Sequence, residues 1–540
     1  MTLVDVTDLS VEFTSGVRAV DGLSFTLDAG GALALVGESG SGKSTVAAAL
    51  LGLHRGTGAR VTGSVLVDGV DVERAPDAEL RRLRGGRAAM VFQDPLSSLD
   101  PYYAVGDQIA EVYRVHSGAS RRAARARAVE VLDRVGIPDA ARRSRARPHE
   151  FSGGMRQRAL IAMALACEPA LLVADEPTTA LDVTVQAQIL DLLHALRQET
   201  GMGLLLVTHD VGVAAESVED VLVMRGGRAV ERGAVGDILG APREAYTREL
   251  LDAVPRVDAP RGRPAAEQGD VVLEAVGLRR EFGRGRRAVT AVDGVSLTVR
   301  EGETLGIVGE SGSGKTTLGR MLVGLLQPTA GQLRHGGAER PGGRVRTDVQ
   351  MVFQDPVSSL NPRRSIGESI ADPLRARGAE DTLVRERVSD LLSRVGLEPA
   401  HYDRYPHEFS GGQRQRVGIA RALAAEPRVI VCDEPVSALD VTTQAQVTGL
   451  LAELQRELGL ALVFIAHDLA VVRQVSDRVA VMRQGRIVEC GPAEEVYGAP
   501  QDPYTKRLLA AVPALDPEAA ARRREARAEL AADGQEMAAA

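Results

Sequence analysis

The chain has 540 residues, of which 44% are apolar and 26% are charged, and its formal net charge is −8. Such a chain is too long for one hydrophobic core and has the composition of an ordinary globular protein. The negative charge gives no reason to expect nucleic-acid binding. The sequence contains no apolar run of about 18 residues, so no membrane span is predicted. Three widely spaced cysteines, Cys167, Cys432 and Cys490, fit neither a disulfide framework nor a zinc pattern, which is typical of a reducing compartment.

Residues 1–10 alternate apolar and polar side chains, which predicts a strand rather than a signal peptide. The apolar run 32–36 predicts a buried strand, and residues 46–53 predict a helix. The loop between them consists of Gly37, Glu38, Ser39, Gly40, Ser41, Gly42, Lys43, Ser44 and Thr45. A strand, a glycine-rich loop with Lys-Ser and a helix together indicate a phosphate-binding loop. We expect Lys43 to reach the β and γ phosphates and the Ser44 hydroxyl to bind Mg²⁺.

The same pattern occurs a second time, with a strand predicted at residues 304–308 and a helix at 318–326. The loop here consists of Gly309, Glu310, Ser311, Gly312, Ser313, Gly314, Lys315, Thr316 and Thr317. Lys315 and Thr316 take the places of Lys43 and Ser44. Two full matches in the correct context argue against a chance turn rich in glycine and serine.

Much of the chain repeats with a period of about 260 residues, far longer than solenoid repeats. The strings Val-Phe-Gln-Asp-Pro, Pro-His-Glu-Phe-Ser-Gly-Gly and Asp-Glu-Pro each occur twice in the same order, and Tyr-Thr…Leu-Leu…Val-Pro ends both halves. Strands alternate with helical patterns, so we predict two α/β domains, at residues 1–255 and 271–513. Residues 256–270 are rich in Pro, Arg, Ala and Gly, a composition that predicts a linker. For residues 514–540, either a solvated helix or a disordered segment is possible, and a plain tail is favoured.

The second half is abbreviated after its phosphate-binding loop. The first half has a hairpin-like stretch at 63–69 and a charged helical run at 78–84, whereas residues 331–346 are short and rich in Gly and Arg. We therefore expect a reduced peripheral β-subdomain in the second half, without loss of catalytic parts.

Acidic pairs follow the apolar strands predicted at 170–174 and 429–432. Asp175 and Asp433 are placed to hold Mg²⁺. Glu176 and Glu434, the next residues, are placed to polarise an attacking water as general bases. Because each pair comes downstream of a phosphate-binding loop, we prefer these roles to a simple helix cap.

Histidines end the following strands, and glutamines occur in the repeated Val-Phe-Gln-Asp-Pro strings. His209 and His467 could contact the γ-phosphate. Gln93 and Gln354 could reach Mg²⁺ and the attacking water, although their spacing alone does not distinguish this role from a plain turn.

A second kind of anion site is predicted where a Ser-Gly-Gly string opens a helix, at residues 155–165 and 413–423. The residues are Ser152, Gly153 and Gly154 in the first half, and Ser410, Gly411 and Gly412 in the second. Since this site lies far in sequence from the phosphate-binding loop, it can serve the nucleotide of a partner domain.

In their order along the chain, these motifs resemble those of ATP-binding-cassette (ABC) ATPases, with Ala-Leu-Asp at 180–182 and 438–440 as a further match. The strings Val-Phe-Gln-Asp-Pro-x-Ser-Ser-Leu and Pro-His-Glu-Phe-Ser-Gly-Gly resemble the dipeptide/oligopeptide/nickel import subfamily, with two subunits fused. This resemblance covers nearly all of residues 1–513. It implies two tandem P-loop NTPase domains, each with a mainly parallel core sheet, a peripheral antiparallel β-subdomain and a helical signature subdomain.

The resemblance also implies a head-to-tail pairing of the two domains around two ATP molecules with Mg²⁺. Site one would combine Lys43, Ser44, Gln93, Asp175, Glu176 and His209 with Ser410, Gly411 and Gly412. Site two would combine Lys315, Thr316, Gln354, Asp433, Glu434 and His467 with Ser152, Gly153 and Gly154. The metal ligands would come from Ser44, Gln93, Asp175, Thr316, Gln354 and Asp433.

Some positions match the family less closely. Phe13 and Phe282 resemble its adenine-stacking aromatic residue, but either could be an ordinary strand aromatic. Met155 stands where the family signature has glutamine, which is present as Gln413. Because the serine and both glycines are kept, we do not expect an inactive site.

By resemblance, the chain is an ATP-hydrolysing motor of an importer for a peptide, nickel, a glycoside or another solute. Its expected place is the cytoplasmic face of the membrane, with two integral-membrane permease subunits as partners, an extracytoplasmic solute-binding protein as an indirect partner and no nucleic acid. The alternative is a soluble tandem cassette that acts on ribosomes. That class has a long charged helical linker, whereas residues 256–269 are short and proline-rich.

Overall fold

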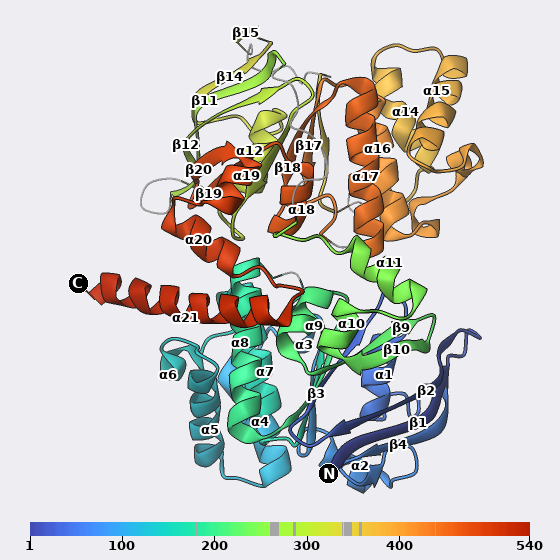
Figure 1. Cartoon of the computed structure of the whole chain (residues 1–540), viewed down its shortest axis with the longest axis vertical. Helices are drawn as coiled ribbons and strands as arrows, with labels where there is room; N and C mark the ends of the chain where they lie inside the picture. The colour runs from blue at the N-terminus through green and yellow to red at the C-terminus, as the bar shows by residue number, and fades with distance from the viewer. Residues whose placement is uncertain are drawn as a thin grey trace. The chain divides into compact units, whose positions relative to one another are not determined.

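The computed structural model describes residues 1–179, 181–259, 269–283, 288–336, 338–339, 348–355, 359–437 and 439–539. These residues form two compact units (Figure 1). Unit 1 contains Met1–Val254 and Pro513–Ala540, and unit 2 contains Pro255–Val512. Most of the expected linker, residues 260–268, lies outside the described residues. None of the helices in the described ranges has the length and apolar character needed to cross a bilayer.

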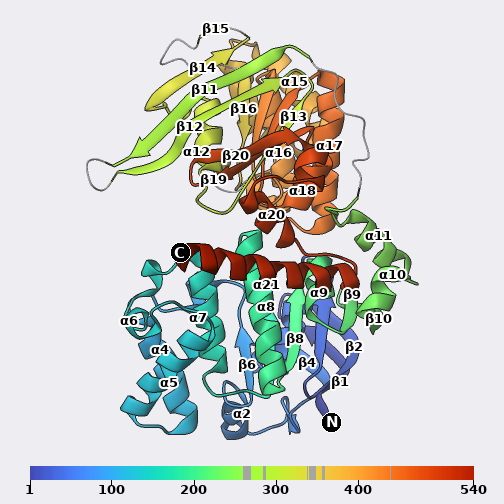
Figure 2. The ribbon, with the colours of Figure 1, turned by 60° about the vertical axis from the view of Figure 1, so that its left-hand side comes forward.

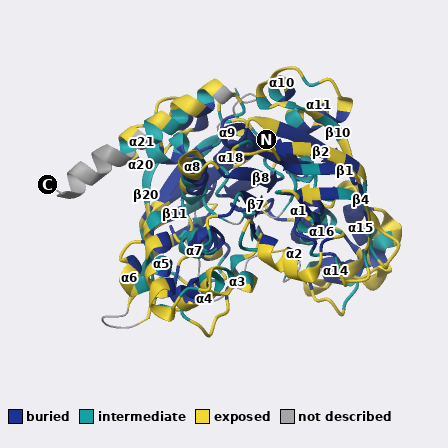
Figure 3. Cartoon of the chain, turned by 90° about the horizontal axis from the view of Figure 1, so that it is seen from below, coloured by how far each residue is buried: buried dark blue, intermediate teal, exposed yellow. Residues whose placement is uncertain are grey.

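The core of unit 1 is a six-stranded sheet in the order β10-β9-β3-β8-β7-β6. Its strands are β3 (Ala32–Val36), β6 (Ala88–Val91), β7 (Leu171–Asp175), β8 (Gly203–Thr208), β9 (Asp220–Arg225) and β10 (Arg228–Ala234). All neighbours pair in parallel except β9 and β10. Strands β3, β7 and β8 are buried along their whole length, as Figure 3 shows for β7 and β8. Burial on both faces explains their continuous apolar sequences.

Helices cover this sheet and form a separate helical part of unit 1. They are α1 (Lys43–Leu50), α2 (Asp77–Leu83), α3 (Pro95–Ser98), α4 (Val105–Ser117), α5 (Arg121–Arg134), α6 (Ala140–Arg143), α7 (Gly153–Leu165), α8 (Val183–Thr200), α9 (Val211–Ser217), α10 (Val235–Gly240) and α11 (Ala245–Ala253). Helices α4, α5 and α7 pack against one another, and α7 also contacts α8. The helical part therefore begins after β6 and returns to the core through α7.

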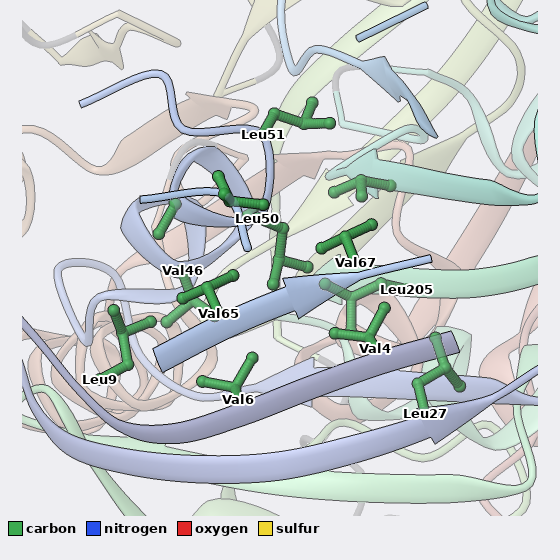
Figure 4. Packing of buried hydrophobic residues seen from close by; sticks show 14 of the residues in the cluster. Val4, Val6, Leu9, Leu27, Val46, Leu50, Leu51, Val65, Val67 and Leu205 are labelled. Carbon is green, nitrogen blue, oxygen red and sulfur yellow. The ribbon is translucent and has the colours of Figure 1, made fainter. Parts of the chain in front are cut away.

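A second, antiparallel sheet in unit 1 has the order β2-β1-β4-β5. Its strands are β1 (Thr2–Glu12), β2 (Arg18–Asp28), β4 (Arg60–Val67) and β5 (Val70–Asp71). Helix α1 shares one apolar cluster with this sheet and with the core sheet. Figure 4 shows side chains of that cluster, with Val4 and Val6 from β1, Val65 and Val67 from β4, and Leu50 from α1. The phosphate-loop helix is thus fixed by both sheets.

Unit 2 repeats this plan with the sheets β16-β17-β18-β13-β19-β20 and β12-β11-β14-β15. Its strands are β11 (Val271–Phe282), β12 (Val289–Arg300), β13 (Thr304–Val308), β14 (Ala330–His335), β15 (Ala338–Glu339), β16 (Val349–Val352), β17 (Val429–Asp433), β18 (Ala461–Ile465), β19 (Arg478–Arg483) and β20 (Arg486–Pro492). Its helices are α12 (Lys315–Leu322), α14 (Ile366–Ala376), α15 (Asp381–Arg394), α16 (Gly411–Leu423), α17 (Val441–Leu458), α18 (Leu469–Val475), α19 (Ala493–Gly498) and α20 (Pro503–Ala510). The expected mainly parallel core sheets are therefore present in both units.

The abbreviated region of the second half keeps the four-stranded order of the peripheral sheet. Strand β14 has 6 residues, whereas its counterpart β4 has 8. Residues 340–347, where a counterpart of α2 would fall, lie outside the described residues. Within the described part, the reduction is a shortened strand.

The C-terminal residues differ from the plain tail favoured by the sequence. Helix α21 (Pro517–Ala539) belongs to unit 1 and lies beside α8 and α9 (Figures 1 and 2). Arg527 donates two hydrogen bonds to Asp191 of α8, at 3.2 and 2.8 Å. It also lies 3.5 Å from the buried carboxylate of Glu216 on α9. The chain therefore leaves unit 1 at Val254 and returns to it at Pro513.

Further contacts fix the beginning of this segment. The backbone N–H of Ala514 donates to Glu216 Oε1 at 3.3 Å, and Arg524 donates to the Glu216 carbonyl at 2.7 Å. In the internal repeat, Asp191 and Glu216 correspond to Gly449 and Gln474. The carboxylates that hold Arg527 thus occur only in the first copy.

We predict that Arg527→Ala releases α21 from unit 1, because it leaves the Glu216 carboxylate buried without this cation. Loss of a charge-assisted contact of this kind corresponds to about tenfold or more in a local opening equilibrium. Amide hydrogen exchange in residues 517–527 should therefore accelerate about tenfold. Arg522→Ala is the matched control, since Arg522 is exposed and pairs only weakly with Glu518 on the same helix. Equal exchange in the two variants would contradict the docking.

Candidate functional site

The phosphate-binding loops lie where the sequence predicts them, but the helices begin earlier, at the lysines. Lys43 Nζ donates to the carbonyl oxygens of Gly37 and Glu38, both at 2.8 Å. Lys315 Nζ makes the same contacts with Gly309 and Glu310, at 2.6 and 2.9 Å. Each ammonium group is buried inside its own loop. The loops are thus folded around the cation expected to bind phosphate.

The residue before each lysine must be glycine. Gly42 has φ +98°, in the left-handed region, and a Cβ there would lie 2.2 Å from the Ala19 carbonyl oxygen. Gly314 has φ +103° and the same conflict with Ala291. Any side chain would push the loop away from the strand beside it, which explains why glycine precedes the lysine in both copies.

Hydroxyl and carboxylate oxygens meet beside each loop. Ser44 Oγ donates to Asp175 Oδ1 at 3.0 Å, and Thr316 Oγ1 donates to Asp433 Oδ1 at 3.0 Å. Burial raises the pKa of both aspartates, and the hydroxyl hydrogen bonds only partly offset it. An all-oxygen donor set of this kind fits Mg²⁺, whose charge would favour the ionised carboxylates.

The predicted general base of the first half is in contact with two other predicted residues. Gln93 Nε2 donates to Glu176 Oε2 at 2.7 Å, and His209 Nδ1 lies 3.1 Å from Glu176 Oε1. Thr179 Oγ1 also donates to Glu176 Oε2, at 2.9 Å. Sequence reasoning missed Thr179, since no pattern singles it out in the repeated stretch after Asp-Glu-Pro.

The second half repeats the main contacts of this cluster. Gln354 Nε2 donates to Glu434 Oε2 at 2.8 Å, and His467 Nδ1 lies 3.3 Å from the same oxygen. Both glutamates have a left-handed backbone, with φ +47° at Glu176 and +46° at Glu434. Such a conformation is unfavourable for a side-chain-bearing residue, and it places both glutamates in the same way in the two copies. The structure thus brings each Gln, Glu and His together.

Each glutamate and its histidine shift one another's ionisation. Burial alone would raise the pKa of Glu176 and Glu434, but the hydrogen bonds and charges of His209 and His467 outweigh it, so that the pKa of both carboxyls is lowered. Burial would lower the pKa of the histidines, yet the glutamates raise it. The ionised glutamates can accept a proton or orient a water.

The Ser-Gly-Gly strings form the N-termini of α7 and α16. Ser152 Oγ accepts a hydrogen bond from the N–H of Met155, and Ser410 Oγ accepts one from the N–H of Gln413. The Gln413 side chain also accepts from the N–H of Ser410 at 3.0 Å, which completes a capping box. The Met155 side chain has no oxygen to accept the corresponding bond from the N–H of Ser152. The substitution of Met for Gln in the signature therefore leaves the N-terminus of α7 with one capping hydrogen bond fewer than that of α16.

Gly154 is required by packing. A Cβ at this position would lie 2.5 Å from a methyl carbon of Val185 on α8. Gly412 has the same relation to Thr443 of α17. The second glycine of each string therefore lets the signature helix pack closely against the helix that follows the Asp-Glu pair.

The two phenylalanines suggested for adenine stacking have different surroundings. Phe13 packs against the apolar cluster of unit 1, and its ring meets that of His54 edge to face, with centroids 5.7 Å apart. Phe282 is 41% exposed, and the Arg280 guanidinium lies 4.8 Å from its ring. Their role towards a nucleotide stays a prediction.

Sequence reasoning also missed two tyrosines that contact the phosphate-binding loops. The hydroxyl oxygens of Tyr246 and Tyr504 accept hydrogen bonds from the N–H groups of Glu38 and Glu310. A signal was present, because both belong to the repeated Tyr-Thr…Leu-Leu…Val-Pro ending, but spacing alone does not reveal the contact.

Two family models match the chain, each of them twice. The model described as "ABC transporter" matches residues 20–179 and 292–437. The model described as "Oligopeptide/dipeptide transporter, C-terminal region" matches residues 230–275 and 488–536. The matched ranges follow the internal repeat and include both phosphate-binding loops.

Curated relatives align over nearly the whole chain. The glutathione import ATP-binding protein GsiA of Salmonella typhimurium is 48% identical over 544 residues, which cover 93% of this chain and 87% of the relative. The protein of the same name from Pectobacterium atrosepticum is 47% identical over 561 residues, with coverage of 95% and 90%. That of Escherichia coli O157:H7 is 48% identical, with coverage of 93% and 87%.

Among solved structures, cbiO1 from Clostridium perfringens, part of the ABC transporter complex cbiONQ, is 31% identical with a TM-score of 0.40. The alignment covers 43% of this chain and 92% of cbiO1. A dimeric ATP-binding cassette in a post-hydrolysis state, bound to ADP and Pi, is also 31% identical, with a TM-score of 0.38 and coverage of 41% and 98%.

Proposed function

Because the chain belongs to the ABC transporter family, as an ATPase with two ATP-binding cassettes, we propose that it is the motor subunit of an importer. The observation that carries the proposal is that each unit has all six of these residue types in place: Lys inside the loop, Ser or Thr bonded to Asp, and Gln and His in contact with Glu. The names of the relatives and of the C-terminal family model support a peptide or a related small solute as cargo. They give no support to the ribosome-acting alternative.

In this proposal, ATP phosphates bind between each loop and the helix that follows it. Lys43 and Lys315 leave the loop carbonyls to contact the β and γ phosphates, while backbone N–H groups surround the phosphate oxygens. Ser44 with Asp175, and Thr316 with Asp433, hold Mg²⁺, which neutralises charge on the phosphates when bound. Gln93 and Gln354 are the further candidate ligands.

Hydrolysis then requires a water in line with the γ-phosphate. The Glu176 carboxylate accepts a proton from this water as its oxygen bonds to the γ-phosphorus, and the bond to the bridging oxygen breaks to release ADP. Gln93 and His209 hold the carboxylate at its two oxygens. Glu434 is the corresponding base in the second half, where Gln354 and His467 both contact its Oε2.

We further propose that the ATP-bound chain pairs its two units, so that each signature helix serves the nucleotide of the other unit. Capped helix N-termini that carry Ser-Gly-Gly present free N–H groups and a partial positive charge to a phosphate. The residues concerned are Ser152, Gly153 and Gly154 for one site, and Ser410, Gly411 and Gly412 for the other. Because the two halves belong to one chain, no second copy is needed.

A groove in unit 2 supports docking on a membrane partner. It has a volume of about 430 Å³, and Phe353, the residue before Gln354, is part of its lining. Its lining consists of Val323, Leu325, Val349, Gln350, Met351, Phe353, Ser359, Pro373, Arg421 and Ala422. Leu325 is 56% exposed. In unit 1, Phe92 directly precedes Gln93 and is 46% exposed.

We propose that these apolar surfaces receive cytoplasmic segments of two permease subunits at the inner face of the membrane. An occupant of the groove would contact Phe353, the residue next to Gln354, which in turn contacts Glu434. This path links a partner to the hydrolytic residues. A solute-binding protein outside the membrane would deliver the cargo to the permeases.

A photocrosslinking experiment in native membranes tests this proposal. We expect a crosslinker at position 325 to form an ATP-dependent adduct with a multi-span membrane protein. A crosslinker at position 458 is the matched control, because Leu458 is also an exposed leucine of unit 2 but lies outside the groove. Adducts with ribosomal proteins, or equal adducts from the two positions, would contradict the proposal.

A further inference from the structure

The C-terminal part of each unit reaches its own phosphate-binding loop through a tyrosine. Tyr246 lies on α11 and Tyr504 on α20. The Glu38 N–H donates to Tyr246 Oη at 3.4 Å, and the Glu310 N–H donates to Tyr504 Oη at 3.0 Å. The contact therefore occurs in both copies at equivalent residues.

This tyrosine and the loop lysine hold the same peptide group. The N–H of Glu310 and the C=O of Gly309 belong to one planar unit. Lys315 Nζ donates to that carbonyl at 2.6 Å, while Tyr504 accepts from the N–H. In the first half, Lys43 Nζ donates to the Gly37 carbonyl at 2.8 Å. Each loop thus begins with a peptide that is held at both of its polar ends.

The tyrosine rings are fixed in place. Tyr246 and Tyr504 are 6% and 4% exposed. The guanidinium of Arg225 lies 4.5 Å from the Tyr246 ring, and that of Arg483 lies 5.0 Å from the Tyr504 ring. Cations at this distance are attracted by an aromatic face.

The helices that carry the tyrosines are anchored too. The Glu231 carboxylate accepts from the N–H groups of Arg243 and Glu244, at 2.9 and 3.2 Å, just before α11. Glu489 accepts from Gln501 and Asp502 in the same way before α20, at 2.8 and 3.1 Å. The phenol oxygen is therefore a preorganised acceptor that does not depend on the loop for its position.

We propose that Tyr246 and Tyr504 are positioning residues that hold the first peptide of each phosphate-binding loop when the lysine moves to the nucleotide. The inference rests on the proposed role of Lys43 and Lys315 in phosphate binding. In the structure, lysine and tyrosine share this peptide. When the ammonium group turns to the phosphates, the carbonyl loses that donor and the tyrosine hydroxyl keeps the peptide in its orientation. Loss of the hydroxyl therefore weakens ATP binding and leaves the hydrolytic residues in place.

Tyr504→Phe tests this role, because it removes one oxygen and keeps the ring. We expect the KM for ATP to rise about threefold to tenfold, the range for one lost hydrogen bond, while kcat changes by less than about twofold. Tyr246→Phe should have a smaller effect, since its hydrogen bond is longer. The double variant should show the largest rise in KM.

Tyr497→Phe is the matched control. Tyr497 is buried in the same C-terminal part of unit 2, and its hydroxyl donates to the Leu469 carbonyl at 2.6 Å, away from the loop. Its loss should lower the melting temperature at least as much as Tyr504→Phe does and leave the KM unchanged. An unchanged KM in Tyr504→Phe, or an equal rise in Tyr497→Phe, would overturn the inference.

Lys315→Ala separates this inference from the proposed function. If Lys315→Ala loses ATP binding but Tyr504→Phe keeps a normal KM, the positioning role is wrong and the proposed site stands. If Lys315→Ala binds ATP normally at both sites, the proposed site itself is wrong.

Discussion

Replacing both Glu176 and Glu434 by glutamine is expected to abolish steady-state ATP hydrolysis while ATP stays bound. An amide keeps the size of the carboxylate but cannot accept the proton of the attacking water. General base catalysis contributes about 100-fold to 10,000-fold, so phosphate release should fall by at least about 100-fold. The substitution leaves Lys43 and Lys315, which are expected to contact the phosphates, unchanged. ATP binding should therefore persist.

The matched control for this variant is Glu168→Gln together with Glu426→Gln. These glutamates also have a left-handed backbone in both halves, with φ +53° and +51°, and they pair with arginines outside the site. Their replacement should leave hydrolysis unchanged. Undiminished phosphate release by the Glu176→Gln/Glu434→Gln protein would show that these residues are not the general bases.

Lys43→Ala is expected to weaken ATP binding at one of the two sites only. The variant removes the ammonium group that the loop of unit 1 surrounds, while Lys315 keeps its contacts in unit 2. Charge-assisted hydrogen bonds are worth about 1.5–3 kcal/mol, which corresponds to a loss of about 10-fold to 100-fold in affinity. Equilibrium dialysis should therefore detect one tight ATP per chain where the unchanged protein binds two.

Lys506→Ala provides the control for loss of a lysine, because Lys506 is exposed on α20. It should bind ATP as the unchanged protein does. Two tight sites in Lys43→Ala would contradict the phosphate role of Lys43.

Much of the fold could be predicted because its signals are local or repeated. Strands β3 and β13 have the predicted bounds, since short apolar runs next to glycine-rich loops leave few alternatives. The clustering of Gln93, Glu176 and His209 follows from parallel strands, whose carboxyl ends meet at one edge of a sheet. Because the motifs occur twice, a role assigned to a motif in one half could be compared with the same motif in the other half.

The docking of α21 could not be predicted, because its partners are distant in sequence. Arg527 contacts Asp191 and Glu216, more than 300 residues away, and a run rich in Ala, Arg and Glu has the same composition whether it is docked or solvated. The hydrogen bonds of Tyr246 and Tyr504 could not be predicted for a similar reason. A repeated motif indicates a shared role but does not say which backbone group it contacts.

The most direct test of the account is the number of ATP molecules retained by the Glu176→Gln/Glu434→Gln protein, measured together with its mass in solution. Two ATP molecules per single chain are expected, because each chain carries two sets of site residues and, as we propose, pairs its own units. One retained ATP per chain, or two retained only when two chains associate, would contradict it.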